Sequence, residues 1–145
     1  MTLNEDTGCI TLPEIGVAIK STLSRSEFLQ TAAFAGASVS FRNEPWCSYR
    51  LPSIPQPDTE LLVVLQFHAE HLLSLSLSHA ASRFGSSWAD WSEERQLVLK
   101  AFHERWLARD VSVHLGEYSW GAISSDYDGK GGSSVITVRY ANRNA

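Results

Sequence analysis

The stretch that decides the fold is residues 60–78, which read ELLVVLQFHAEHLLSLSLS. Residues 60–67 are apolar at both odd and even positions, which is typical of a central strand. Leucine and serine then alternate over 73–78, so one face of this second strand is expected to be buried and the other wet. Residues 68–70 can form the turn between the strands. The stretch therefore predicts an antiparallel hairpin.

A second hairpin is expected near the C-terminus. Strands over 118–127 and 134–140 flank the sequence DGKGG at 128–132, whose glycines permit the positive φ angles of tight turns. Upstream, the alternation around Val39 and Phe41 predicts a half-buried strand. Residues 46–51 can form the strand that runs back beside it.

Residues 51–58 are expected to be a loop, because they contain three prolines and proline cannot donate a hydrogen bond to a sheet. A short amphipathic helix is expected over 13–24. Pro13 suits a first helical turn, and Ile15 and Ile19 begin an apolar repeat of four residues.

The main helix is expected over about 91–109. Asp90 followed by Glu93 fits a capping box, and Glu93 with Glu94 places negative charge at the favourable end of the helix dipole. An apolar stripe should face the core. Its members are Val98, Phe102 and Trp106, joined by Leu99 and Ala101.

These elements predict an α+β domain. An antiparallel sheet of five to six strands would pack on the helix over about 91–109, and the short helix over 13–24 would be added at its side. The chain has 145 residues, of which 43% are hydrophobic. That size fits one domain over 1–145, with a loose N-terminal segment over 1–12.

Charge and hydropathy exclude several partners. The net charge is −4, and no run of three lysines or arginines occurs, so nucleic acid is not expected as a partner. The acidic start does not resemble a secretory signal, and the longest apolar run, 61–65, is too short for a membrane helix. A cytoplasmic location is expected. Cys9 and Cys47 could form one disulfide, and the sequence leaves open whether they pair.

No pattern predicts catalysis, a cofactor or a metal. His68 and His71 are expected to be solvated turn residues, and Asp126 with Asp128 lacks the further oxygen ligands of a calcium loop. No nucleophile elbow occurs. His103 is interpreted as a helix-face histidine hydrogen-bonded to a neighbour, and Cys47 as a small buried hydrophobe. The protein is therefore not expected to be an enzyme.

The C-terminal part of the chain resembles small bacterial immunity proteins, which are encoded beside polymorphic toxins in contact-dependent growth-inhibition and related systems. The resemblance is best over residues 88–140. It is carried by WADWSEE (88–94), HERWL (103–107), YSWG (118–121), SDYDGKG (125–131) and VITVRY (135–140).

The resemblance implies a non-enzymatic protein, monomeric or a small oligomer, that binds one cognate toxin domain and occludes its active site. Many such toxins are basic nucleases, which an acidic inhibitor can attract. The candidate contacts for the toxin are Asp90, Glu93, Glu94, Asp126, Asp128 and Trp120.

Two alternatives stay open at the level of sequence. One is a generic protein-interaction or adaptor domain, such as a secretion chaperone, which would use the same surface on a different partner. The other is a small metal-dependent hydrolase built on His68, His71 and Asp128.

Overall fold

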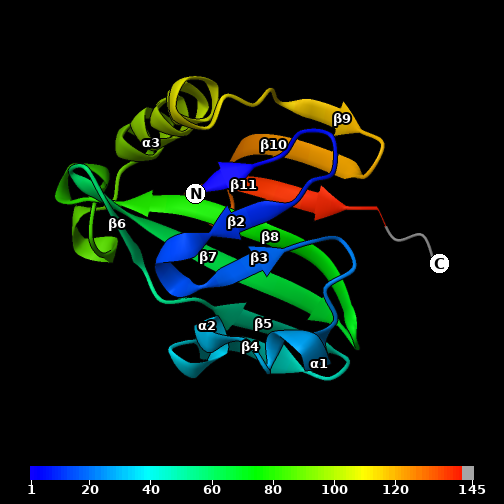
Figure 1. Ribbon diagram of the computed structural model, residues 1–145. Helices are drawn as coiled ribbons and strands as arrows, with labels where there is room; N and C mark the ends of the chain where they lie inside the picture. The colour runs from blue at the N-terminus through cyan, green and yellow to red at the C-terminus, as the bar shows by residue number, and fades with distance from the viewer. Residues whose placement is uncertain (142–145) are drawn as a thin grey trace.

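One large antiparallel sheet dominates the computed structural model, which describes residues 1–141 (Figure 1). Its strands follow the order β4-β5-β7-β8-β11-β10-β9, and β6 pairs with the start of β7. The strands are β4 (Ser38–Asn43), β5 (Trp46–Arg50), β6 (Ile54–Gln56), β7 (Thr59–His68), β8 (His71–Ala80), β9 (Gly116–Tyr118), β10 (Gly121–Asp128) and β11 (Ser133–Tyr140).

The predicted hairpin over 60–78 is confirmed as β7 and β8, at the centre of this sheet. Val63 lies opposite Leu77, and Leu65 opposite Leu75. All four of these side chains are fully buried. On the other face of β7 the side chains are only half-buried, so the strand is covered on one face, although its apolar sequence predicted two.

A bulge near the turn changes which leucines of β8 face the core. Gln66 lies opposite Ser74 while Phe67 lies opposite Leu72, so Leu73 has no opposite residue. Leu72 therefore takes the core position that simple alternation assigned to Leu73, which is half-buried.

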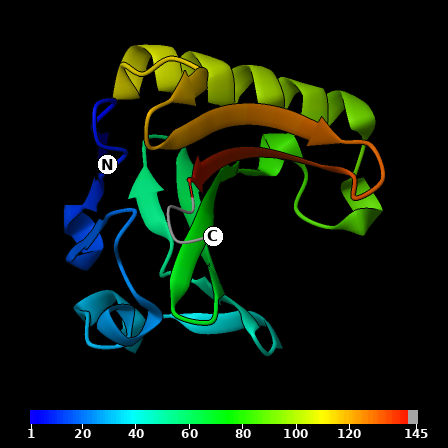
Figure 2. The ribbon, with the colours of Figure 1, turned by 90° about the vertical axis from the view of Figure 1, so that its right-hand side faces the viewer.

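A second layer covers one face of the large sheet. It contains a small antiparallel sheet of β1 (Thr2–Leu3), β2 (Ile10–Leu12) and β3 (Val17–Ile19) in the order β1-β2-β3. It also contains the short helices α1 (Arg25–Phe28) and α2 (Ala32–Ala35) and the main helix α3 (Glu93–Trp106), which packs on β10 and β11 (Figures 1 and 2). The core lies between the layers, and within residues 1–141 no helix is long and apolar enough to cross a membrane.

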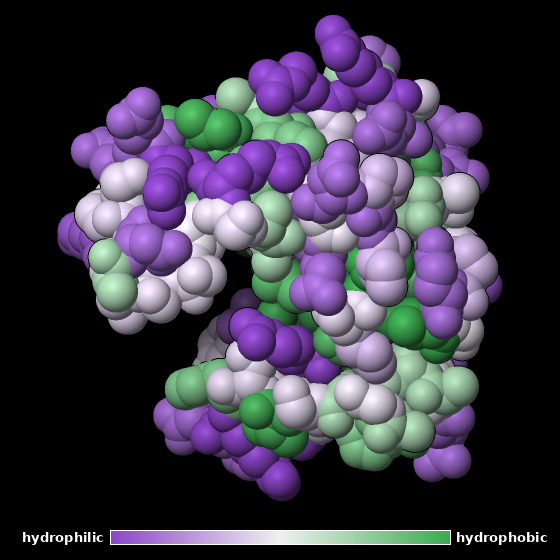
Figure 3. All heavy atoms as spheres, turned by 90° about the vertical axis from the view of Figure 1, so that its left-hand side faces the viewer, coloured by the Kyte–Doolittle hydropathy of each residue, from purple (hydrophilic) through white to green (hydrophobic). Residues whose placement is uncertain are grey.

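The other face of the large sheet carries no second layer among residues 1–141. The strands curve around this open side in Figure 2, and the space-filling view in Figure 3 shows the surface hollowed there. Half-buried hydroxyl and apolar side chains point to this face. They include Leu62, Val64, Ser74, Ser76, Ser78 and Thr137.

The predictions for the N-terminal segment were wrong. Residues 1–12 contribute β1 and β2, and the predicted helix over 13–24 is a single 3₁₀ turn, Pro13–Ile15, followed by β3. Gly16 ends the turn in the left-handed conformation (φ 66°). Buried residues therefore alternate along β2 and β3, whereas the predicted helix required them to recur every four residues.

The predicted fold class was also wrong in its proportions. The large sheet has eight strands and the small sheet three, so the molecule is mostly sheet. Three errors account for the missing strands. The N-terminal segment was assigned to coil and helix, Ile54–Gln56 pairs despite its proline, and Gly116–Tyr118 is a separate strand from β10. Pro55 is tolerated because β6 pairs on one side only, with β7.

The main helix is confirmed, but its start and its stripe differ from the prediction. Ser92 is the N-cap residue, since its hydroxyl accepts a hydrogen bond from the Arg95 backbone N–H at 3.1 Å. The helix ends at Trp106 and continues as a π turn, Leu107–Val111. The buried stripe is Leu99, His103 and Trp106, and Val98 is 48% exposed.

Two buried histidines join α3 to the sheet. The His79 backbone N–H donates to Nε2 of His103 at 3.2 Å, as the sequence predicted for a helix-face histidine. Nε2 of the His79 ring lies 3.0 Å from Oε1 of Gln56. Burial, followed by repulsion from His103 and Arg83, lowers the pKa of His79 to about 3, and burial lowers the pKa of His103 to about 4. Both rings are therefore neutral at pH 7.

Acid should destabilise the protein through these histidines. In the unfolded chain a histidine has a pKa near 6.5. As the pH falls from about 6.5 to about 4, the histidines become protonated in the unfolded state while they stay neutral in the folded state, so protonation favours unfolding. We expect the free energy of unfolding to fall by up to ~1.4 kcal/mol per pH unit for each histidine in this window and to be flat above pH 7. Urea unfolding at pH 7.5, 6 and 5 measures this slope. His103→Gln should reduce the slope, and an unchanged stability at pH 5 would contradict the neutral pair.

A second test concerns the start of β10. A methyl group on Gly121 would lie 1.8 Å from the Arg139 carbonyl oxygen, whereas one on Gly116 would meet no atom within 4 Å. Because φ is positive at both residues, Gly116→Ala isolates backbone strain, and Gly121→Ala adds the clash. We expect losses of about 1 kcal/mol and about 3 kcal/mol respectively, measured by urea unfolding. Equal losses would show that β10 and β11 can shift to accommodate the methyl group on residue 121 without a further loss of stability.

Candidate functional site

The start of α3 meets the tip of the β10–β11 hairpin, far apart in sequence. The indole N–H of Trp91 donates to the Gly132 carbonyl oxygen at 2.6 Å. Gly132 has φ 72°, and a Cβ there would lie 3.2 Å from the same indole nitrogen, so the ring packs directly on the glycine backbone. The contact fixes the loop before α3 against the hairpin tip.

Asp90 organises that loop from within. Its carboxylate accepts hydrogen bonds from the backbone N–H groups of Ser86 and Ser87, each at 2.9 Å at the shortest, and lies 3.5 Å from the Arg95 guanidinium. The bonds from Ser87 and Ser86 hold the pKa of Asp90 below its ordinary value. Asp90 therefore stabilises the 3₁₀ turn Trp88–Asp90, and its carboxylate is engaged within its own loop.

Gln96 joins the same region to the sheet. Its Nε2 donates to the Phe84 carbonyl at 3.3 Å, and its Oε1 accepts from the Ser134 backbone N–H at 3.0 Å. The Ser134 hydroxyl in turn donates to the Gln96 carbonyl at 2.5 Å. One side chain of α3 thus holds the loop and β11 at fixed positions.

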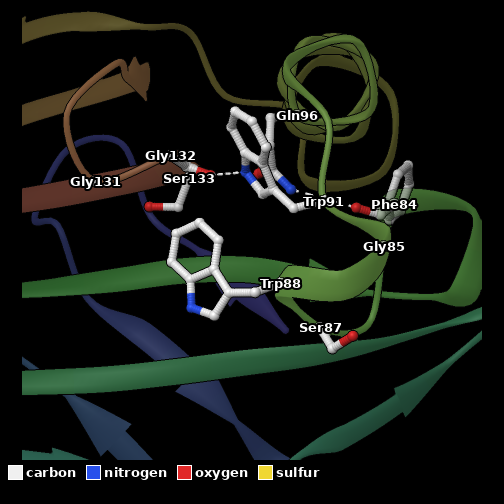
Figure 4. A pocket seen from close by; sticks show the side chains of 9 residues that line it. All are labelled: Phe84, Gly85, Ser87, Trp88, Trp91, Gln96, Gly131, Gly132 and Ser133. Carbon is white, nitrogen blue, oxygen red and sulfur yellow. Dashed lines mark hydrogen bonds between the residues drawn. The ribbon is translucent and has the colours of Figure 1, made fainter.

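Trp88 stands on this framework with its ring in solvent. It is 78% exposed, and its ring centre lies 6.1 Å from that of Trp91, with 42° between the planes. A pocket of about 250 Å³ opens beside the two rings (Figure 4). Its lining residues are Phe84, Gly85, Ser87, Trp88, Trp91, Gln96, Gly131, Gly132 and Ser133.

Two carboxylates lie near the hairpin tip on which Trp91 packs. Glu93 and Asp128 both act on the hydroxyl of Tyr127, whose pKa is raised first by partial burial and then by these two charges. Within residues 1–141, neither carboxylate lies within ion-pair distance of a Lys, Arg or His side chain. We call Trp88, Trp91, Glu93, Tyr127 and Asp128 the Trp88 surface.

The apolar character continues along the helix. Leu97 and Val98 lie one turn after Glu93 and Glu94, and both are about half exposed, at 47% and 48%. An exposed apolar patch with a charged rim is typical of protein interaction sites.

The structure separates the six predicted contact residues. Glu93, Glu94 and Asp128 are exposed at or beside the Trp88 surface, and Asp126 is exposed on β10. Asp90 is occupied by its own loop. Trp120 is 3% exposed, and its indole N–H donates to the Glu5 carbonyl oxygen at 2.6 Å, so Trp120 belongs to the core and not to a binding surface.

The sequence indicated that Trp88 could be partly exposed, but Trp88 was not selected among the contact residues, and it is the most exposed large hydrophobic residue of the described chain. Trp88 falls in a connection outside any apolar period, which is the pattern of a residue not recruited to the core. Trp120 immediately precedes Gly121 and the strand β10, and a Cβ at Gly8 would lie 2.5 Å from its ring. That close packing cannot be seen in the local sequence.

The residues of the predicted metal alternative do not converge. His68 and His71 face each other across the β7–β8 turn, whereas Asp128 ends β10 at the tip of the other hairpin. In the part of the chain that the structure describes, no three His, Cys, Asp or Glu side chains are grouped so that they could hold a metal ion. Cys9 and Cys47 are both free cysteines, and Cys47 is buried as predicted.

The comparisons with known proteins give no relative: no family model matches the chain, and no significant match was found among curated proteins or solved structures.

The two tryptophans should differ in what they contribute to stability. Trp91→Phe removes the donor to Gly132 and leaves its carbonyl unpaired, so we expect the free energy of unfolding to fall by about 1 kcal/mol. Trp88→Ala removes an exposed ring and should change stability by less than about 0.5 kcal/mol. Urea unfolding of both variants measures the difference. A large loss for Trp88→Ala would mean that this ring holds the loop together.

Proposed function

We propose that this protein is an immunity protein: it binds a cognate bacterial toxin domain in the cytoplasm and covers the toxin's active site, without catalysis of its own. The observation that carries the proposal is Trp88, an indole 78% exposed on a loop that is otherwise tightly bonded. Tryptophan is enriched at the energetic centres of protein interfaces, because it removes a large apolar area from water on binding.

The framework under Trp88 supports this function. Asp90, Trp91 and Gln96 fix the loop before any partner arrives, through hydrogen bonds to the loop itself, to the hairpin tip and to β11. A preorganised surface loses less conformational entropy on association than a loop that must fold on its partner. Tight binding is then possible from a small surface.

The charges indicate the kind of partner. Glu93, Glu94 and Asp128 carry their negative charge without a cation partner among the described residues, on a chain of net charge −4. A basic surface would be attracted to them over several ångströms and oriented by them. Toxin domains that act on nucleic acid have such surfaces, since they must bind phosphates.

Co-expression tests the function directly. The product of the neighbouring reading frame should arrest bacterial growth when expressed alone, and co-expression of this protein should restore growth. Trp88→Ala should weaken the purified complex at least tenfold, which corresponds to about 1.4 kcal/mol. Binding is measured by isothermal titration calorimetry.

Trp46→Ala is the matched control, because Trp46 is 40% exposed but lies on β5, at the other end of the sheet. This variant should bind as the wild-type protein does. The proposal is wrong if the neighbouring product is not toxic or is not bound. A neighbouring product that is bound but is not toxic would instead favour an adaptor or secretion chaperone.

A further inference from the structure

We infer that the pocket lined by Trp88, Trp91 and the β10–β11 hairpin tip receives an arginine side chain of the protein partner. The inference rests on the proposed function, since it names the group that the partner would insert. It is carried by three features of the pocket: the arrangement of the two rings, the uncompensated negative charge and an unoccupied hydroxyl group.

The exposed Trp88 ring offers an aromatic face suited to a flat cation. The ring centres of Trp88 and Trp91 are 6.1 Å apart and their planes are inclined by 42°, so the two rings pack against each other, and an entering group stacks on the side of Trp88 that faces solvent. Trp91 is held in place by its hydrogen bond to Gly132 and by its packing on the Gly132 backbone, so it supports Trp88 from one side. A guanidinium is planar and stacks on indole faces, and indole is the side chain that attracts cations most strongly.

The charge beside the pocket favours a cation. Asp128 sits at the hairpin tip, where its carboxylate accepts from the Lys130 backbone N–H at 2.9 Å and lies against Gly131, which lines the pocket. Glu93 and Asp128 both act on the Tyr127 hydroxyl, so the two charges lie on the same side of the molecule. Arg95 does not neutralise them, because its guanidinium donates to the Asp90 carbonyl at 3.0 Å and pairs with the Asp90 carboxylate. An anionic group in the same place would be repelled.

A polar group is available to complete the contact. The hydroxyl of Ser133 lines the pocket and forms no hydrogen bond with any residue of the described chain. The Ser87 hydroxyl, by contrast, already accepts from the Ala89 backbone N–H at 3.2 Å. A guanidinium presents five N–H donors in fixed directions, so it can donate to Ser133 while its plane stacks on the Trp88 ring. A lysine ammonium is compact and strongly hydrated, and it lacks the flat face that would stack on the Trp88 ring.

Short peptides test the inference without the toxin. The probe is acetyl-Gly-Arg-Gly-amide, titrated into ¹⁵N-labelled protein while the indole N–H signals are followed by NMR; Trp88→Phe identifies the Trp88 signal. We expect a saturable shift of the Trp88 and Trp91 signals. The matching citrulline peptide, which has the same shape without the charge, should bind at least fivefold more weakly, as should the lysine peptide.

Variants of the protein separate the contributions. Glu93→Gln with Asp128→Asn should weaken the arginine peptide at least threefold and make its binding less sensitive to salt, since screened charges lose their attraction. Lys130→Ala is the control, because it removes a cation from the same hairpin tip and should bind the peptide no more weakly than the wild-type protein.

The outcomes distinguish this inference from the proposed function. Equal affinity for the arginine and citrulline peptides, or no saturable shift of the Trp88 signal, overturns the arginine site. If the toxin complex nevertheless depends on Trp88, the function stands and only the nature of the inserted group is wrong. Saturable arginine binding without any toxin complex overturns the function and leaves the arginine site supported.

Discussion

The pairing of β7 with β8 is the interaction on which the rest of the structure depends. Leu61, Val63, Leu65 and Phe67 of β7 are fully buried on one face, and this face is the floor on which the small sheet and α3 pack. The hairpin is local in sequence, so it can form early, and every other strand of the large sheet adds to one side of it or the other. A shift of one residue in its register would turn the apolar set to water, so the core fixes the register strongly.

Sequence alone predicted the parts of the fold whose pattern is local and strong. The two long hairpins and the body of α3 were predicted correctly, because continuous apolar runs, alternating residues, glycine-rich turns and helix-cap residues determine structure locally. The N-terminal segment was not predictable in this way. Ile15 and Ile19 fit a helical repeat, and Ile10, Leu12, Val17 and Ile19 fit an alternating one; only the face of the large sheet, supplied by residues far along the chain, selects the second.

The candidate site shows the same limit. The carboxylates Glu93, Glu94 and Asp128 were selected correctly as surface residues, because charge is rarely buried. The assignment of Trp120 to the binding surface failed, since exposure of a large ring depends on whether a complementary surface exists elsewhere. Gly8 supplies that surface for Trp120, and nothing in the described chain supplies it for Trp88. Asp90 looked like a contact residue and proved to be the residue that shapes the loop.

The loop before α3 divides its work between two sets of residues. Asp90, Trp91 and Gln96 hold the backbone through bonds that point inward, whereas Trp88, Glu93 and Asp128 point outward. Changes in the outward set alter recognition with little effect on folding. Under the proposed function, a lineage carrying this architecture could exchange one adversary for another by a few substitutions, while the scaffold that displays them is inherited intact.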